Sequence, residues 1–152
     1  MSEVEITREV HEKLAMSLFN ATWALLDKED RTVEDDIEMI HSAHASRYHW
    51  GQIGEPLHFE RGEWQISRVN SVLGRREPAL YHAKLCLEIC QENNIRDFDI
   101  AFAYEAMARA YAVEGDRDNF EKYRDLAEKA GEEIDENGNR DYFLRELKTI
   151  EL

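Results

Sequence analysis

The stretch EWQISRVNSVLG, residues 63–74, aligns with YEAMARAYAVEG, residues 104–115, at an offset of 41 residues. Each run ends in a glycine, and a second amphipathic run follows each of them, at residues 78–90 and 119–130. Apolar residues recur at three- and four-residue spacing, which is the period of an amphipathic helix. Because many helices end in a left-handed glycine, each unit is predicted to be a helix, a tight turn and a second helix.

The rest of the sequence also favours helices. It has two prolines and seven glycines in 152 residues, too few turn residues for an all-β protein of this length. We expect antiparallel hairpins at about residues 5–51, 57–93 and 98–131 and a short capping helix at about 140–150. The predicted fold is all-α, a stack of helical hairpins that forms one domain over residues 1–152.

The charge balance restricts the classes of partner. The formal net charge is −14, and a molecule this acidic repels nucleic acid and anionic membrane surfaces. The sequence has no run of about 18 apolar residues that would span a bilayer. Its start, residues 1–5, is acidic where a secretory signal would be basic and then apolar. We therefore expect no nucleic-acid or membrane partner and a cytoplasmic location.

Two details of the first hairpin follow from helical spacing. Thr32 and Asp35 stand where an N-cap of the second helix is expected. The first helix is predicted to bury a stripe through Val10, Leu14 and Thr22. The second is predicted to bury a stripe that consists of Val33, Ile37, Ile40, His44, Tyr48 and Gly51. His44 is therefore predicted to be a core histidine.

The middle hairpins resemble tetratricopeptide repeats, a family of right-handed stacks of helical hairpins. The resemblance rests on small residues inside the first helix, a later tyrosine, the turn glycines and small residues in the partner helix. These are Ser67, Ala108, Tyr111, Gly74, Gly115, Ala79, Cys86 and Ala127. The period of 41 residues is longer than the family's, which is about 34, and neither copy ends in proline.

The resemblance implies a concave groove, lined by the first helix of each hairpin, that holds a partner such as an extended peptide. The family's groove-facing spacing selects Arg61, Trp64, Arg68, Ser71, Phe102, Glu105 and Arg109. Arginine binds carboxylate or phosphate through two parallel hydrogen bonds, and tryptophan offers a flat apolar surface. The alternative is structural: Arg68 and Arg109 pair with Glu105 or Glu60, and Trp64 fills the gap between hairpins.

A second candidate site involves the histidines. His41, His44 and Tyr48 are predicted to face the same cavity as Trp64 and Arg68, where a small polar ligand would bind.

The sequence gives weaker signals for a metal. Glu38 and His41 have the Glu-x-x-His spacing of di-iron bundles, but the first helix has no acidic residue on its predicted buried stripe. Cys86 and Cys90 have no second pair to complete a metal site, so we expect buried, reduced thiols. No metal or other cofactor is predicted.

These observations favour a non-enzymatic binding or scaffold protein that holds a peptide segment or a small anionic ligand in a helical-repeat groove. No residue is assigned a catalytic role, because the serines lie outside a Gly-x-Ser-x-Gly context and no glycine-rich phosphate loop occurs. The alternative is a metal- or ligand-dependent enzyme that uses His41, His44 and Arg68. Apolar surface left at the end of a short stack also makes a homodimer an expectation.

Overall fold

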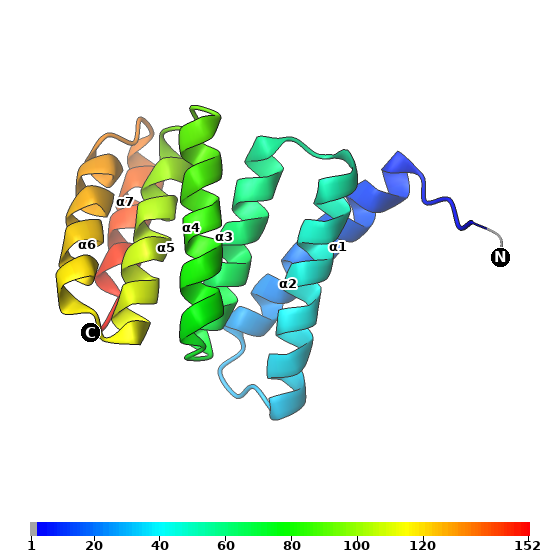
Figure 1. Cartoon of the computed structure of the whole chain (residues 1–152), viewed down its shortest axis with the longest axis horizontal. Coiled ribbons are helices and arrows are strands. Elements are labelled where there is room, and N and C mark those ends of the chain that lie inside the picture. Colours follow the sequence, from blue (N-terminus) through cyan, green and yellow to red (C-terminus); the bar gives the residue numbers. More distant parts are fainter. Residues whose placement is uncertain (1–2) are drawn as a thin grey trace.

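The computed structural model describes residues 3–152, and these residues form seven α-helices and no strand. Figure 1 shows the first hairpin at one end of the molecule and the last three helices at the other, where the C-terminal helix lies between the two before it. The helices are α1 (Arg8–Asp27), α2 (Val33–Ile53), α3 (Pro56–Val72), α4 (Arg76–Glu92), α5 (Phe98–Glu114), α6 (Arg117–Glu132) and α7 (Asn137–Lys148).

The ends of the helices follow local sequence signals. The Asp35 amide donates to the Thr32 hydroxyl at 3.1 Å, and the Thr32 amide donates to the Asp35 carboxylate at 3.0 Å, so the predicted N-cap of α2 is confirmed. Gly74 and Gly115 have φ angles of +71° and +77°, the left-handed conformation that glycine adopts without strain. Helix α1 begins at Arg8, later than expected, and Thr7 caps it.

Neighbouring helices pack in pairs. Helix α1 packs on α2, α3 on α4 and α5 on α6, and the α2–α3 and α4–α5 contacts join the pairs. Inside the second pair, the Ser67 hydroxyl donates to the Ala79 carbonyl at 2.8 Å, and both residues are buried. Ala108, which is 41 residues after Ser67, is also buried. The small residues predicted at these positions are therefore part of the buried interior.

The main core lies between α4 and α5. The alanines of α5 let α4 approach closely, and cysteines and a leucine of α4 fill the space between them. The buried members are Ala79, Ala83, Cys86, Leu87, Cys90, Ala103, Ala106, Met107 and Ala110.

Helix α7 packs against α5 and α6. It buries Phe143 and Leu147. Gly131 at the end of α6 is in close contact with Phe143, because a Cβ atom at position 131 would overlap the aromatic ring. Helix α7 therefore covers the last hairpin, as a capping helix would.

The predicted buried stripe of α1 is confirmed at Thr22 but wrong at Val10 and Leu14, and most of the predicted stripe of α2 is wrong. Val10 and Leu14 are exposed on α1. On α2 the side chains of Val33, Ile37 and Tyr48 are 70%, 51% and 62% exposed, and His44 is exposed as well. Helix α2 is instead turned so that it buries Met39, Ser42, Ala43 and Ser46.

Hydroxyl groups explain this rotation. Thr22 of α1 and Ser42 of α2 are hydrogen-bonded to each other at 2.7 Å, and the Ser46 hydroxyl donates to the Ala15 carbonyl at 2.7 Å. Small polar side chains that are satisfied in this way can be buried at little cost and let two helices approach closely. A prediction based on hydrophobic periodicity assigns the two serines of α2 to the surface.

Among residues 3–152, no helix combines the length and the apolar character that crossing a bilayer requires.

Candidate functional site

Three of the predicted groove residues, Arg61, Trp64 and Phe102, lie together in the wall of a cavity of about 290 Å³. Four helices contribute to it, namely α1, α3, α5 and α7. We call it the aromatic cavity. Its lining consists of Phe19, Trp23, Glu60, Arg61, Trp64, Phe98, Asp99, Phe102 and Tyr142.

The apolar wall is a continuous series of aromatic rings. The ring centroids of Trp23 and Trp64 are 5.5 Å apart, and Trp64 meets the edge of Phe102 at 5.6 Å. Phe102 in turn lies 4.7 Å from Phe98 and 6.1 Å from Tyr142. These are ordinary distances for aromatic pairs, which hold one another in fixed orientations. The cavity wall is therefore built from rings on four different helices.

The polar part of the cavity is an arginine between two carboxyl groups. Arg61 donates to both oxygens of Asp99, from Nε at 2.8 Å and from Nη2 at 3.1 Å. Burial raises the pKa of Asp99, but the Arg61 guanidinium and the neighbouring Glu60 carboxyl group outweigh it and hold that pKa below its usual range. Asp99 is therefore ionised, and the Arg61–Asp99 pair is close to neutral.

Glu60 is the unusual group of the site, since its side chain is almost completely buried. Burial, together with the neighbouring Asp99 carboxylate, raises the pKa of Glu60 to about 11. At neutral pH its carboxyl group is therefore protonated. This fold keeps a neutral carboxylic acid against an ionised one.

Two buried polar atoms of the lining residues have no hydrogen-bond partner in the part of the chain that the structure describes. They are Nε1 of Trp64 and Oε1 of Glu60. Most buried polar groups in proteins are hydrogen-bonded, and leaving a donor unpaired costs about 1–3 kcal/mol. An oxygen atom of a bound molecule would satisfy the indole N–H of Trp64.

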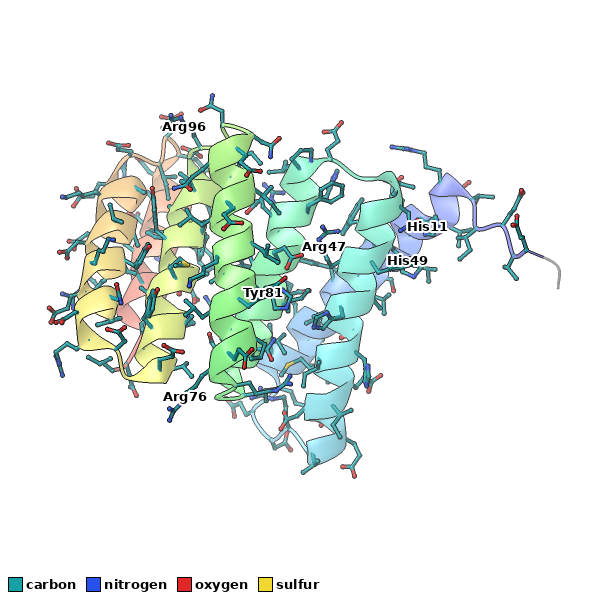
Figure 2. The ribbon with its side chains drawn as sticks, viewed as in Figure 1. His11, Arg47, His49, Arg76, Tyr81 and Arg96 are labelled. Atoms are coloured by element: carbon teal, nitrogen blue, oxygen red, sulfur yellow. The ribbon has the colours of Figure 1, made fainter. Side chains whose placement is uncertain are left out.

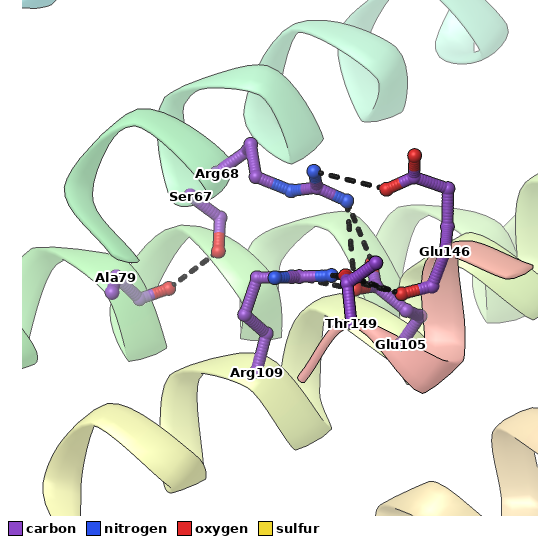
Figure 3. Close-up of polar contacts among 7 residues, drawn as sticks. All are labelled: Ser67, Arg68, Ala79, Glu105, Arg109, Glu146 and Thr149. Carbon is purple, nitrogen blue, oxygen red and sulfur yellow. Dashed lines mark hydrogen bonds and ion pairs between the residues drawn. The ribbon is translucent and has the colours of Figure 1, made fainter. Parts of the chain in front are cut away.

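Arg68, Glu105 and Arg109 also come together, but outside the lining of the aromatic cavity (Figure 3). Glu105 is fully buried and accepts from Arg109 Nε at 2.6 Å and from Arg68 Nη2 at 3.5 Å. The alternative that both arginines pair with Glu105 is therefore confirmed. Arg68 also lies over the ring of Trp64, 5.3 Å from the centroid.

The C-terminal helix supplies the other partners of these arginines. Arg68 Nη1 lies 3.4 Å from the Glu146 carboxylate, and Arg109 Nη2 donates to the Thr149 hydroxyl at 2.9 Å. Figure 3 shows both guanidinium groups directed at this end of α7. The guanidinium groups predicted to face an open groove are therefore engaged by the chain itself. Ser71 is buried beside Arg109 in a separate depression of about 170 Å³.

His41, His44 and Tyr48 do not line the aromatic cavity, so the prediction that they face it is wrong. All three are exposed on α2, and the prediction of a core histidine at position 44 is also wrong. The His44 ring lies 5.4 Å from that of His82 on α4. Because Arg68 is held between Glu105 and Glu146, the residues of the alternative enzyme site do not converge.

The His44 environment is a small polar network across α2, α3 and α4. His82 Nδ1 lies 2.6 Å from Glu63 Oε2, and Arg47 Nε donates to Glu63 Oε1 at 3.1 Å. Figure 2 shows Arg47 in the space between α2 and the second hairpin. Partial burial and the neighbouring His82 lower the pKa of His44. This network joins the first two hairpins.

The cavity also contains residues that the sequence did not single out. Phe19 and Trp23 lie beside the predicted stripe of α1, so their position was a usable signal. The sequence contained no signal that Glu60 and Asp99 line a cavity, because a carboxylate near the start of a helix usually faces solvent, where it interacts with the helix dipole.

A second buried cluster touches the cavity through Glu60. The thiols of Cys86 and Cys90 are fully buried, as expected, and each lies 3.4 Å from Oε2 of Glu60. Two thiols and a carboxyl group are a donor set that metal ions bind.

The fold and the site together define an all-α helical protein with an aromatic cavity. Comparisons of the chain with protein-family models, with curated protein sequences and with solved structures find no match.

Proposed function

We propose that this protein is a non-enzymatic binding protein, similar to a short tetratricopeptide array, that holds a peptide segment or a small anionic ligand in the aromatic cavity. The occupant would place an apolar group among the rings and an oxygen atom against Trp64 and Arg61. The single observation that carries the proposal is the unpaired, buried indole N–H of Trp64 in a residue that lines a preformed cavity.

The packing of the helices supports the repeat-like part of this proposal. Successive helices pack as hairpins, and Ser67, Ala79 and Ala108 are buried where the helices of a hairpin meet. In a right-handed stack of this kind, the first helix of every hairpin faces the concave side. Helices α1, α3 and α5 are those first helices, and all three contribute to the cavity.

The chemistry of the lining supports an occupant with an apolar body. Six of the nine lining residues are aromatic, and aromatic rings stabilise a buried apolar group through a large contact area. A volume of about 290 Å³ is at the small end of ligand pockets. It suits one apolar side chain of a peptide or one small molecule.

Arg61 supports the polar part. Its Nε and Nη2 atoms are engaged by Asp99, while no partner for Nη1 occurs in the described chain. The Arg61 side chain is 50% exposed, so a carboxylate or a carbonyl oxygen has access to it. Arg68 and Arg109 are less suitable, because Glu105 and Glu146 already balance their charge.

The experiment uses the three indole N–H resonances of Trp23, Trp50 and Trp64 in a nitrogen–proton NMR spectrum. The probes are phenylpropionate and an unstructured peptide that ends in phenylalanine. We expect at least one probe to shift the Trp64 resonance and to leave that of Trp50, which lies outside the cavity, unchanged. Binding of the peptide and not of phenylpropionate would select the peptide version of the proposal.

A matched pair of variants tests the role of the indole N–H. Trp64→Phe keeps an aromatic ring and removes the donor, so it should weaken binding about 5- to 10-fold, the equivalent of one hydrogen bond. Trp50→Phe is the control and should bind like the unmodified protein. The proposal is wrong if neither probe shifts the Trp64 resonance, or if both variants bind equally well.

A further inference from the structure

The cluster formed by Glu60, Cys86 and Cys90 lies between α3 and α4. Its three donor atoms lie within 4.8 Å of one another, and all three residues are buried. Cys86 and Cys90 are four residues apart on α4, so both thiols project from the same face of the helix toward α3. The carboxyl oxygen Oε2 of Glu60 lies 3.4 Å from each sulfur atom.

The chain alone satisfies this cluster poorly. Thiols are weak hydrogen-bond donors, yet they are the partners of Oε2 of a carboxyl group that is 1% exposed. The other oxygen, Oε1, has no hydrogen-bond partner among the described residues and lies 3.8 Å from Arg61 Nε. Oε2 therefore has only two weak donors as partners, and Oε1 has none. A cation bound between Oε2 and the two sulfur atoms would satisfy this buried carboxyl group better.

We propose that Glu60, Cys86 and Cys90 bind a zinc ion. Tetrahedral zinc has Zn–S distances of about 2.3 Å and Zn–O distances of about 2.0–2.2 Å, which separate a sulfur and an oxygen ligand by about 3.5 Å. The two observed oxygen–sulfur distances of 3.4 Å agree with that separation. Thiolate ligands select zinc over magnesium and calcium, which prefer oxygen.

The charges around the cluster are compatible with this ion. Two thiolates and a carboxylate give three negative charges, which a Zn²⁺ ion reduces to one, and the Arg61 guanidinium is the nearby cation. Asp99 is not available as a fourth ligand in this arrangement, because Arg61 holds both of its oxygens. Three protein ligands leave one position of a tetrahedral ion for water. Binding displaces the protons of both thiols and of the carboxyl group.

This inference goes beyond the proposed binding function, although the two share Glu60. The aromatic cavity would retain its rings and its indole N–H without the metal, and the cysteines are not among the residues that line it. Metal binding and ligand binding are therefore measured by different signals, and either one can fail without the other.

The test is a titration of the untagged full-length protein, reduced and freed of metal with a chelator, with Co²⁺ as the probe. Cobalt bound by thiolates shows a sulfur-to-metal charge-transfer band in the near ultraviolet. We expect this band to saturate at one equivalent and to disappear when Zn²⁺ is added. Cys86→Ser and Cys90→Ser should each abolish tight binding. Glu60→Gln should weaken metal binding by more than about 100-fold, because Glu60 is a ligand. Loss of a residue that only hydrogen-bonds to a ligand would weaken binding by at most about 100-fold.

The His11–His49 pair provides the control. The Nδ1 atoms of these residues are 2.8 Å apart on the surface between α1 and α2, where Figure 2 shows the two side chains together. Histidine pairs also bind divalent metals, but without a thiolate band. His11→Ala should leave the cobalt spectrum unchanged. A metal that binds without the thiolate band, or that His11→Ala removes and Cys86→Ser does not, would overturn the proposal.

A second measurement does not depend on the folding of any variant. In the unmodified protein, one equivalent of Zn²⁺ should slow the reaction of Cys86 and Cys90 with a thiol reagent at least about tenfold, because a bound thiolate is not free to react. It should also raise the unfolding temperature, since the ion binds the folded chain. Equal thiol reactivity with and without zinc would contradict the proposed site.

Discussion

Replacing Glu60 by glutamine should change how the stability of the protein depends on pH. In the unfolded chain, the Glu60 carboxyl group ionises near its ordinary pKa of 4.5, whereas in the fold its pKa is about 11. Between these values the folded protein binds one more proton than the unfolded chain. The free energy of unfolding therefore decreases by about 1.4 kcal/mol for each pH unit, from a maximum below the unfolded pKa.

Glutamine has a similar shape and cannot ionise, so the variant lacks this loss of stability. From about pH 5.5 to about pH 8, the variant should gain about 3 kcal/mol relative to the unmodified protein. This slope does not depend on the folded pKa as long as that value exceeds about 8. Asp99, whose pKa is lowered, contributes in the opposite direction and only at more acidic pH. It is present in both proteins and cancels in the comparison.

The assay is urea unfolding followed by helical circular dichroism at several pH values, with a chelator present so that no metal is bound. The variant minus unmodified difference in the free energy of unfolding should rise steadily with pH. Glu88→Gln, the same substitution at an exposed position of α4, controls for the loss of a carboxyl group elsewhere. Stability curves that stay parallel for Glu60→Gln and the unmodified protein would mean that Glu60 is ionised in the fold, and the account of its burial would be wrong.

Two further predictions concern packing. Gly131→Ala places a methyl group against Phe143, and such overpacking should lower the free energy of unfolding by about 1–3 kcal/mol, as measured by urea unfolding. It should also loosen α7 and speed proteolysis within residues 137–148. An unchanged rate of proteolysis would contradict the close contact. Glu105→Ala leaves two guanidinium groups without their buried partner and should cost about 3–5 kcal/mol in the same unfolding assay. Glu9→Ala removes an exposed ion pair and should change stability by less than about 1 kcal/mol. Equal effects of these two substitutions would contradict the importance of burial.

The sequence predicted the central hairpins correctly because their hydrophobic pattern is carried by residues that are buried in the structure. Ile66 and Met107, which are 41 residues apart, are both buried in their helices. Their spacing also gave the correct rotation of α3 and α5, so that Arg68 and Arg109 contact the same carboxylate. Hydrophobic periodicity is reliable when the core face is aliphatic.

The first hairpin shows where this reasoning fails. Its interface is formed by Thr22, Ser42 and Ser46, whose hydroxyl groups are satisfied across the interface. On a hydropathy scale Ser42 and Ser46 are polar, so the exposed Ile37 and Tyr48 of the same helix were assigned to the core instead. The distinction depends on hydrogen bonds between two helices, which the sequence of one helix does not contain.

The candidate site was predicted in part for the same reason. Trp64, Phe102 and Arg61 follow from the rotation of α3 and α5. The protonated Glu60, the Asp99 beside it and the Tyr142 contributed by α7 depend on contacts between residues that are far apart in the chain. The ion pair between Arg68 and Glu146, which are 78 residues apart, is another contact of this long-range kind.

That long-range ion pair has a consequence for how the molecule unfolds. In a simple helical array each hairpin contacts its immediate neighbours, so the array can fray from one end, one repeat at a time. Here Arg68 of the middle hairpin reaches past α5 to Glu146 of α7, and the same guanidinium is bound to Glu105. Opening of the C-terminal helix therefore exposes charges that the second and third hairpins share. The middle and the C-terminal end of the molecule should accordingly open as one cooperative unit.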